Sequence, residues 1–125
     1  MPMMDDPDYY VRLVIARRVA PALLARMIGD TEAEVRRVVA RRIPKEWLLR
    51  MASDHDPAVR LEIAQRLTPD LLSRLRYDPD WRVRYEVASR IPVGEICDLT
   101  EDSDAFVQDM ARSRCGGKQS GEYPA

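Results

Sequence analysis

The sequence has few cysteines, histidines, glycines and aromatic residues, and these shortages exclude several classes of protein. Two cysteines and one histidine in 125 residues are too few for a disulfide-rich secreted scaffold or for a zinc site built from cysteine and histidine. No apolar run approaches the ~20 residues of a membrane-spanning helix, and the sequence does not open with a signal-peptide pattern. We therefore expect a cytoplasmic protein of about one domain, without a membrane partner.

Lysine is also scarce, because eighteen of the twenty basic residues are arginine. Twenty-one acidic residues balance them and give a net charge of −1, so the total charge argues neither for nor against a nucleic-acid partner. The charge is unevenly distributed, however. Residues 9–90 carry 17 basic and 11 acidic residues, a net charge of +6, while both ends of the chain are acidic.

What the sequence does contain is an internal repeat with a period of 24 residues. Aspartate recurs in one column of the aligned units, namely Asp6, Asp30, Asp54, Asp78 and Asp102. Valine recurs in another, namely Val11, Val35, Val59, Val83 and Val107. Further columns hold isoleucine, alanine, leucine and methionine, so that a unit reads approximately D-x-x-x-x-V-R-x-x-V-A-x-R-V-x-x-x-x-L-x-x-M, with a proline near its middle.

Each unit has the pattern of two helices. The apolar residues Val11, Ile15 and Val19 share one face of an α-helix, and either Asp6 or Asp8 with its equivalents is the candidate N-cap. The mid-unit proline ends this helix, and a second short helix, α or 3₁₀, follows it. No segment alternates with period two, so the sequence predicts an all-α fold.

The units must stack to be stable. About seven apolar side chains per unit cannot offset the conformational entropy lost on ordering a unit alone, so neighbouring units have to share a core, as in a solenoid. We predict one repeat domain over residues 1–115, with about four full units and a degenerate fifth unit as a C-terminal cap. Residues 116–125 are predicted to be a disordered tail.

The V-R-x-x-V-A-x-R core, with L-x-x-M or L-x-x-L after the proline, resembles the leucine-rich repeat variant family over about Asp6 to Cys115. HEAT and armadillo units share D-P-x-V-R but have about 40–47 residues. The resemblance implies a right-handed superhelix of alternating α- and 3₁₀-helices. It also implies a link to nitrogen-fixing bacteria, where some members carry an N-terminal iron–sulfur module. Two cysteines cannot supply the four thiolates of such a cluster, so we expect no cofactor and no metal.

No catalytic residues are predicted, because the sequence has no G-x-S-x-G, H-E-x-x-H, P-loop or glycine-rich dinucleotide turn. We interpret His55, which lies between two aspartates, as a solvated turn residue. Cys115 occupies an apolar column, which favours a small core residue, and Cys97 is interpreted as a half-buried bystander. The paired aspartates recur in every unit, which favours helix capping over catalysis. We therefore expect a protein that is not an enzyme.

Arginine forms three columns, which we name by their expected positions. The inner arginines are Arg12, Arg36, Arg60 and Arg84. They flank the apolar stripe of the first helix, and we predict that they form a structural ladder with the aspartate column, which includes Asp30, Asp54 and Asp78. The helix-end arginines are Arg18, Arg42, Arg66 and Arg90. These lie in the last helical turn, where they suit the helix dipole and unpaired carbonyls.

The outer arginines are Arg26, Arg50 and Arg74, on the short helix of each unit, and the fourth unit has Asp98 at this position. Arg17, Arg41 and Arg76 are irregular additions. A solvated face and a ligand-binding face are both compatible with this pattern. Trp47 aligns with leucines and is predicted to be a core residue, whereas Trp81 fits either a core or an anchor for a partner. The predicted partner-binding residues are Arg17, Arg41, Arg26, Arg50, Arg74 and Trp81.

We therefore predict a non-catalytic repeat scaffold that binds a protein partner of unknown identity through an arginine-rich face. The resemblance implies a nitrogen-fixation or redox context. The alternative is nucleic-acid binding, in which the arginine columns follow a phosphate backbone. The scarcity of lysine and the acidic residues among the arginines, such as Glu32, Glu34, Asp56 and Asp80, make nucleic acid the second choice.

Overall fold

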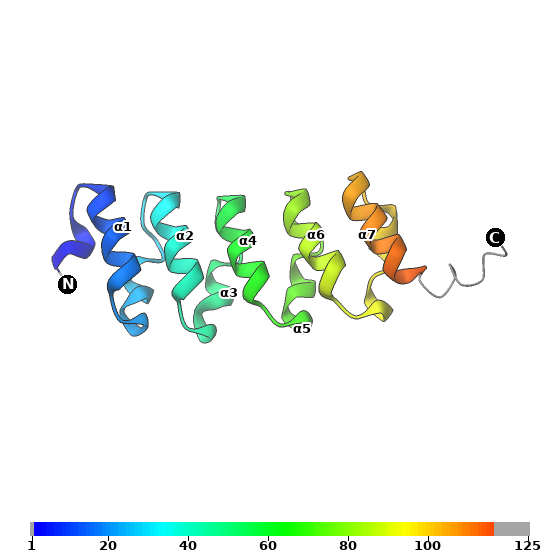
Figure 1. Ribbon diagram of the computed structural model, residues 1–125, viewed down its shortest axis with the longest axis horizontal. Helices are drawn as coiled ribbons and strands as arrows, with labels where there is room; N and C mark the ends of the chain where they lie inside the picture. The colour runs from blue at the N-terminus through cyan, green and yellow to red at the C-terminus, as the bar shows by residue number, and fades with distance from the viewer. Residues whose placement is uncertain (1, 117–125) are drawn as a thin grey trace. The chain divides into compact units, whose positions relative to one another are not determined.

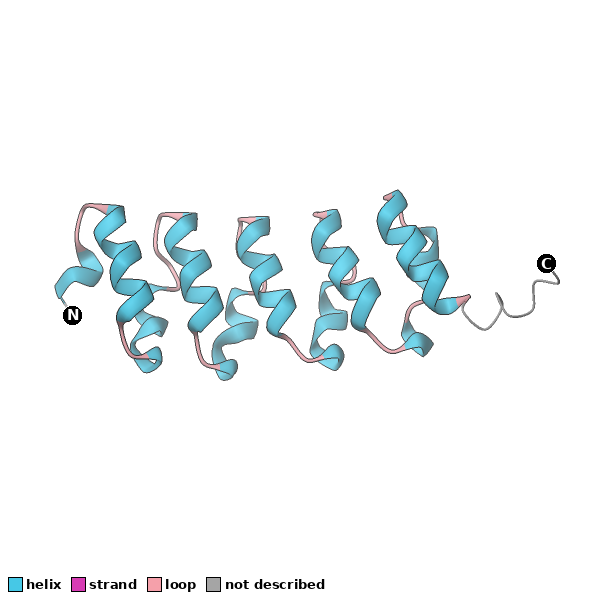
Figure 2. Ribbon diagram, in the orientation of Figure 1, coloured by secondary structure: helices cyan, strands magenta, loops and turns pink. Residues whose placement is uncertain are grey.

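The computed structural model describes residues 2–116, and every regular element in this part of the chain is helical (Figure 2). The prediction of an all-α fold is therefore confirmed. The described chain divides into two compact units, Met1–Arg66 and Leu67–Ala125. The single repeat domain over residues 1–115 stays a prediction. Of the predicted tail, Gly116 caps the last helix, and residues 117–125 lie outside the described part.

The first unit contains three ten-residue helices joined by short helical segments (Figure 1). The long helices are α1 (Tyr9–Arg18), α2 (Ala33–Arg42) and α4 (Pro57–Arg66). The short segments are η1 (Pro2–Asp5), η2 (Pro21–Met27), η3 (Lys45–Trp47) and α3 (Leu48–Met51).

The second unit continues the alternation of short and long helices. Its long helices are α6 (Trp81–Arg90) and α7 (Ala105–Cys115). Its short segments are α5 (Pro69–Leu72), η4 (Ser73–Leu75), η5 (Val93–Glu95) and η6 (Cys97–Glu101). The five long helices of the two units begin at residues 9, 33, 57, 81 and 105, so each begins 24 residues after the one before.

Sequence determines both ends of the long helices. The carboxylates of Asp8, Asp56 and Asp80 accept hydrogen bonds of 2.7–2.9 Å from the backbone N–H two residues further on, which satisfies a donor without a partner inside the helix. At the other end, Ile43 and Ile91 are extended, as expected of residues that precede a proline. Asp8, Asp56 and Asp80 are thus the N-caps, whereas Glu32 at the equivalent position before α2 makes no side-chain cap hydrogen bond. The alternative left open for Asp6 is wrong.

Within each unit the packing follows one scheme. Successive long helices contact each other, α1 with α2, α2 with α4, and α6 with α7. Short helices also pack on the long helix that follows them, as η2 does on α2 and η6 on α7 (Figure 1). Val35 and Val39 of α2 and its C-cap residue Ile43 are completely buried by this packing. No described helix combines the length and the apolar character needed to cross a membrane.

Candidate functional site

The inner arginines bind carboxylates inside each unit. In the first unit, Arg36 Nε lies 2.8 Å from Asp54 Oδ2, and its Nη2 lies 3.1 Å from Asp54 Oδ1. Its Nη1 donates to the backbone carbonyl of Asp30 at 2.7 Å. Arg12 makes the same three contacts, bidentate with Asp30 and single with the Asp6 carbonyl. Each of these guanidinium groups therefore links the loop before its own long helix to the loop before the next long helix.

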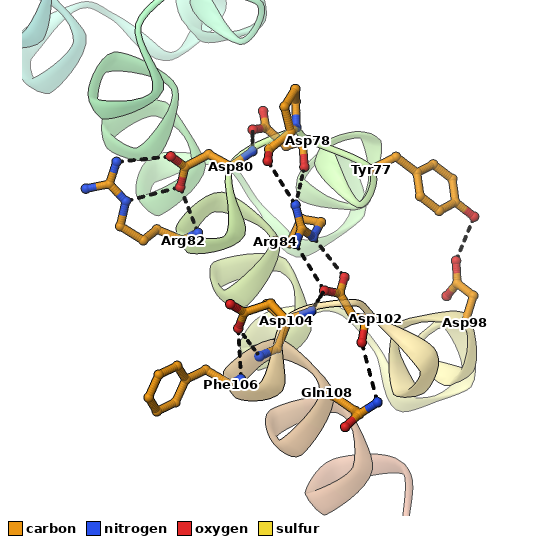
Figure 3. A network of polar contacts seen from close by, with 12 residues as sticks. Tyr77, Asp78, Asp80, Arg82, Arg84, Asp98, Asp102, Asp104, Phe106 and Gln108 are labelled. Carbon is orange, nitrogen blue, oxygen red and sulfur yellow. Dashed lines mark hydrogen bonds and ion pairs between the residues drawn. The ribbon is translucent and has the colours of Figure 1, made fainter.

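The second unit repeats the arrangement (Figure 3). Arg84 holds the Asp102 carboxylate through contacts of 2.8 and 3.1 Å and donates to the Asp78 carbonyl at 2.8 Å. The Asp102 carboxylate also accepts the backbone N–H of Asp104 at 2.8 Å. The hydrogen bond to Asp102 raises the pKa of Arg84 above its ordinary value, despite an opposing effect of burial.

The inner arginines bind acceptors that belong to the protein itself. The side chain of Arg36 is 14% exposed and that of Asp54 is 9% exposed, so the pair is largely removed from solvent. Arg60, the remaining inner arginine, donates to the carbonyls of Asp54 at 2.7 Å and His55 at 3.1 Å. The chemistry of this column is therefore structural, because its donors are directed at the protein's own acceptors.

The helix-end arginines cap the preceding long helix rather than their own. Arg66 on α4 donates to the carbonyls of Ala40 and Ile43, at 2.9 and 2.7 Å, at the end of α2. Arg42 likewise donates to the Ala16 carbonyl of α1 at 2.6 Å. Arg18 on α1 is exposed, because only the short η1 precedes its helix. This column thus satisfies carbonyls that have no partner within their own helix.

The outer arginines differ from both other columns. Arg26, Arg50 and Arg74 are exposed, and none forms an ion pair with a described residue. The Arg50 guanidinium lies 4.9 Å from the ring centroid of Trp47, a cation–π contact that leaves its donors unused. Trp47 is half-buried, not a fully buried core residue.

Two of the outer arginines line open hollows in the first unit. One hollow of about 400 Å³ contains Arg26 together with the engaged Arg12 and the acidic residues Asp5 and Asp6. A second hollow of about 490 Å³ contains Arg50 with Arg36, Asp54 and His55. His55 is exposed there. Each hollow thus holds one satisfied guanidinium group and one that is free to bind a ligand.

The irregular arginines do not form one set. Arg17 is exposed and has no ion pair with a described residue. Arg41 instead lies 2.8 Å from Glu62 on the neighbouring helix, which raises the pKa of Arg41. Arg76 lies 2.7 Å from Asp98. The structure therefore groups Arg17 with the free arginines and separates Arg41 from them.

Trp81 lies in an aromatic cluster of the second unit. Its ring stacks on Phe106 with a centroid distance of 5.5 Å and meets Tyr85 edge-on at 6.3 Å. Trp81 is 40% exposed and Phe106 is 63% exposed, so the cluster presents aromatic surface to solvent. Sequence reasoning missed Phe106, since the other 24-residue repeats have tyrosine, glutamate, alanine or arginine in its column. A comparison of the first turns of successive helices would have found it.

The two cysteines lie together in the second unit. Cys97 Sγ of η6 is 3.3 Å from Cys115 Sγ of α7, and both thiols are free. Cys97 is exposed and Cys115 is half-buried, so the interpretations as a half-buried bystander and a core residue were both wrong. Among the residues that the structure describes, no group of three or more histidines, cysteines or acids is arranged to hold a metal ion.

Comparison with solved structures gives an informative match. No family model and no curated protein matches the chain. A solved structure described as "a leucine-rich repeat variant with a novel repetitive protein structural motif" is similar to it, with 37% sequence identity and a TM-score of 0.88. The match covers 91% of this chain and 49% of the other, so this chain spans about half the length of that protein.

Proposed function

We propose that this chain, a leucine-rich repeat variant in its repeat portion, is a non-catalytic scaffold that binds an acidic segment of a protein partner. The observation that carries the proposal is the contrast within the hollows of the first unit. Arg26 and Arg50 are exposed beside inner arginines that already hold carboxylates. A partner's carboxylate would give these two outer arginines the acceptors that the chain itself does not provide.

The surroundings of the outer arginines favour a protein over a nucleic acid. Asp5 and Asp6 lie in the same hollow as Arg26, and their negative charge would repel a continuous phosphate backbone. A single peptide carboxylate meets less of this repulsion than a chain of phosphates, because it brings only one negative charge into the hollow. The exposed Trp81 cluster offers a second kind of contact that is common at protein interfaces.

The test compares two pairs of substitutions that remove the same charge from the first unit. The variant Arg26→Gln/Arg50→Gln removes the free arginines of the hollows, and Arg18→Gln/Lys45→Gln removes two exposed charges that line neither hollow. Binding of a fluorescein-labelled peptide of alternating glutamate and leucine is followed by anisotropy. We expect the hollow variant to weaken binding at least about tenfold, which is about 1.4 kcal/mol, and the control to change it less than about twofold.

Two results would overturn the proposal. The first is an absence of peptide binding by the unmodified chain at about 50 mM salt, where electrostatic attraction is strongest. The second is an equal loss of affinity in both variants, which would mean that net charge matters and the hollows do not. Labelled duplex DNA is titrated in parallel at about 50 and 200 mM salt, and tight binding with a steep salt dependence would favour the nucleic-acid alternative.

The remaining expectations concern the fold and its context. A right-handed solenoid of 24-residue repeats is supported by the regular helix starts and by similarity to the solved repeat protein. Such an arrangement would repeat the position of Arg26 and Arg50 at Arg74. The cytoplasmic location and the nitrogen-fixation or redox context remain predictions.

A further inference from the structure

The cysteine pair is a reactive group in the described chain that does not recur from repeat to repeat. Cys97 aligns with Ala25, Leu49 and Ser73, and Cys115 aligns with Val19, Ile43, Leu67 and Ile91. Both positions therefore accept residues without redox chemistry elsewhere in the chain. Two cysteines at these positions in consecutive repeats are not required by the packing scheme.

The geometry brings the two sulfurs within reach of a covalent bond. Their separation of 3.3 Å is about 1.3 Å longer than a disulfide bond, and a rotation of either side chain can supply that movement. The two residues come from elements that already contact each other, η6 and α7. The backbone is also held locally, because Thr100 Oγ1 donates to the Cys97 carbonyl at 2.6 Å and Arg112 Nε donates to the Thr100 carbonyl at 2.9 Å.

We propose that Cys97 and Cys115 form a reversible intramolecular disulfide by exchange with a low-molecular-weight disulfide such as oxidised glutathione. The exposed Cys97, as a thiolate, attacks one sulfur of the oxidant, forms a mixed disulfide and releases the first glutathione thiolate. Cys115, as a thiolate, then attacks Cys97 Sγ and releases the second. The two protein thiols are oxidised, the oxidant is reduced to two thiols, and the two protons lost by the cysteines end on the two glutathione molecules.

The order of attack follows from the environment of the two thiols. Cys97 is exposed, whereas Cys115 is half-buried at the end of α7, so an oxidant in solution meets Cys97 first. The hydrogen bond with Cys97, followed by burial, raises the pKa of Cys115. The raised pKa lowers the fraction of Cys115 that is present as the nucleophilic thiolate, which suits a role in the second step.

The bond would restrain the end of the described repeats. It would connect the first residue of η6 to the last residue of α7, so that the last helix could no longer separate from the short helix on which it packs. A crosslink that closes such a loop stabilises the folded state, chiefly by restricting the unfolded chain. The oxidised protein should consequently resist thermal unfolding better than the reduced protein.

The test incubates the full chain with oxidised glutathione and measures free thiols, intact mass and melting temperature. We expect the loss of both thiols, a mass lower by two hydrogens with no bound glutathione, and a melting temperature higher by several degrees that dithiothreitol reverses. The matched variants are Cys97→Ser and Cys115→Val, which introduce residues found at the aligned positions Ser73 and Val19. Cys115→Val should stop at a glutathione adduct on Cys97.

Other products would overturn the inference. Retention of both thiols, two stable glutathione adducts per chain, or disulfide-linked dimers would each show that the sulfurs do not pair within the molecule. An intramolecular bond that leaves the melting temperature unchanged would contradict the proposed restraint on α7. None of these outcomes depends on peptide binding, so this inference and the proposed function can fail separately.

Discussion

Arg36 and Arg50 line the same hollow of the first unit, but their surroundings are opposite. Arg36 is largely buried and holds Asp54 through two contacts, whereas Arg50 is exposed and only stacks on Trp47. Both residues recur every 24 positions. The comparison shows that periodicity alone does not distinguish a structural arginine from one available to a ligand. The difference lies in whether the fold places an acceptor in reach.

The largest expected difference between the two arginines is in stability. Arg36→Ala should lower the free energy of unfolding by about 2–3 kcal/mol, because it leaves the Asp54 carboxylate largely buried without its counter-charge. Arg50→Ala should cost less than about 1 kcal/mol, since it removes one exposed cation–π contact. Urea unfolding of both variants measures the two values.

A double-mutant cycle then assigns the loss to the pair. Arg36→Ala/Asp54→Ala removes both charges, and it should be more stable than the sum of the two single losses implies. If Arg36→Ala proved as mild as Arg50→Ala, the inner arginines would not be structural. The distinction between the inner and outer columns would then lose its energetic basis.

The helix-end arginines extend the comparison to neutral acceptors. Arg66→Met keeps the aliphatic stem but removes the donors to the Ala40 and Ile43 carbonyls. We expect a loss of about 1–2 kcal/mol in urea unfolding, because those carbonyls at the end of α2 lose their partner. Arg18→Met changes the exposed member of the same column and should stay within about 0.5 kcal/mol. Equal effects in the two variants would contradict the capping role.

Much of the helical pattern could be predicted from the sequence. The apolar spacing and the prolines in the middle of each repeat indicated long helices followed by short ones, since both features lie within one 24-residue repeat. The choice between Asp6 and Asp8 as N-cap could not be made, because both precede the helix closely and both are aspartate. In the structure Asp8 caps the helix, while the carboxylate of Asp6 binds the backbone N–H of Asp8.

The candidate sites were harder to predict, because they depend on contacts between successive 24-residue repeats. Arg41 was predicted to bind a partner as an irregular addition to the outer arginines, but it forms an ion pair with Glu62 on the next helix. The same limit hid the Trp81–Phe106 stack and the cysteine pair, each of which joins residues of consecutive 24-residue repeats. The residue pattern of a single 24-residue repeat does not show which side chains of the next repeat lie beside it.

The smallest expected effect concerns the end of the outer column, where Asp98 replaces arginine. Burial raises the pKa of Asp98, but hydrogen bonds from Tyr77 and Arg76 lower it by more. The net pKa of Asp98 is therefore below its ordinary value. A depressed carboxylate pKa stabilises the fold above the pKa of the unfolded chain, about 3.9 for aspartate, and this contribution is lost as pH falls through the folded value. Asp98 is exposed, so we expect Asp98→Asn to cost about 0.5 kcal/mol or less at neutral pH.

Stability measured against pH separates this charge from the others. The difference between the unmodified chain and Asp98→Asn should be constant above about pH 5, shrink as the pH falls below the ordinary aspartate value, and decrease with added salt. If the difference in stability stayed unchanged in acid, the contribution of Asp98 would come from packing and not from its charge interaction with Arg76. The replacement of arginine by Asp98 at the last position of the outer column would then not stabilise the fold through its charge.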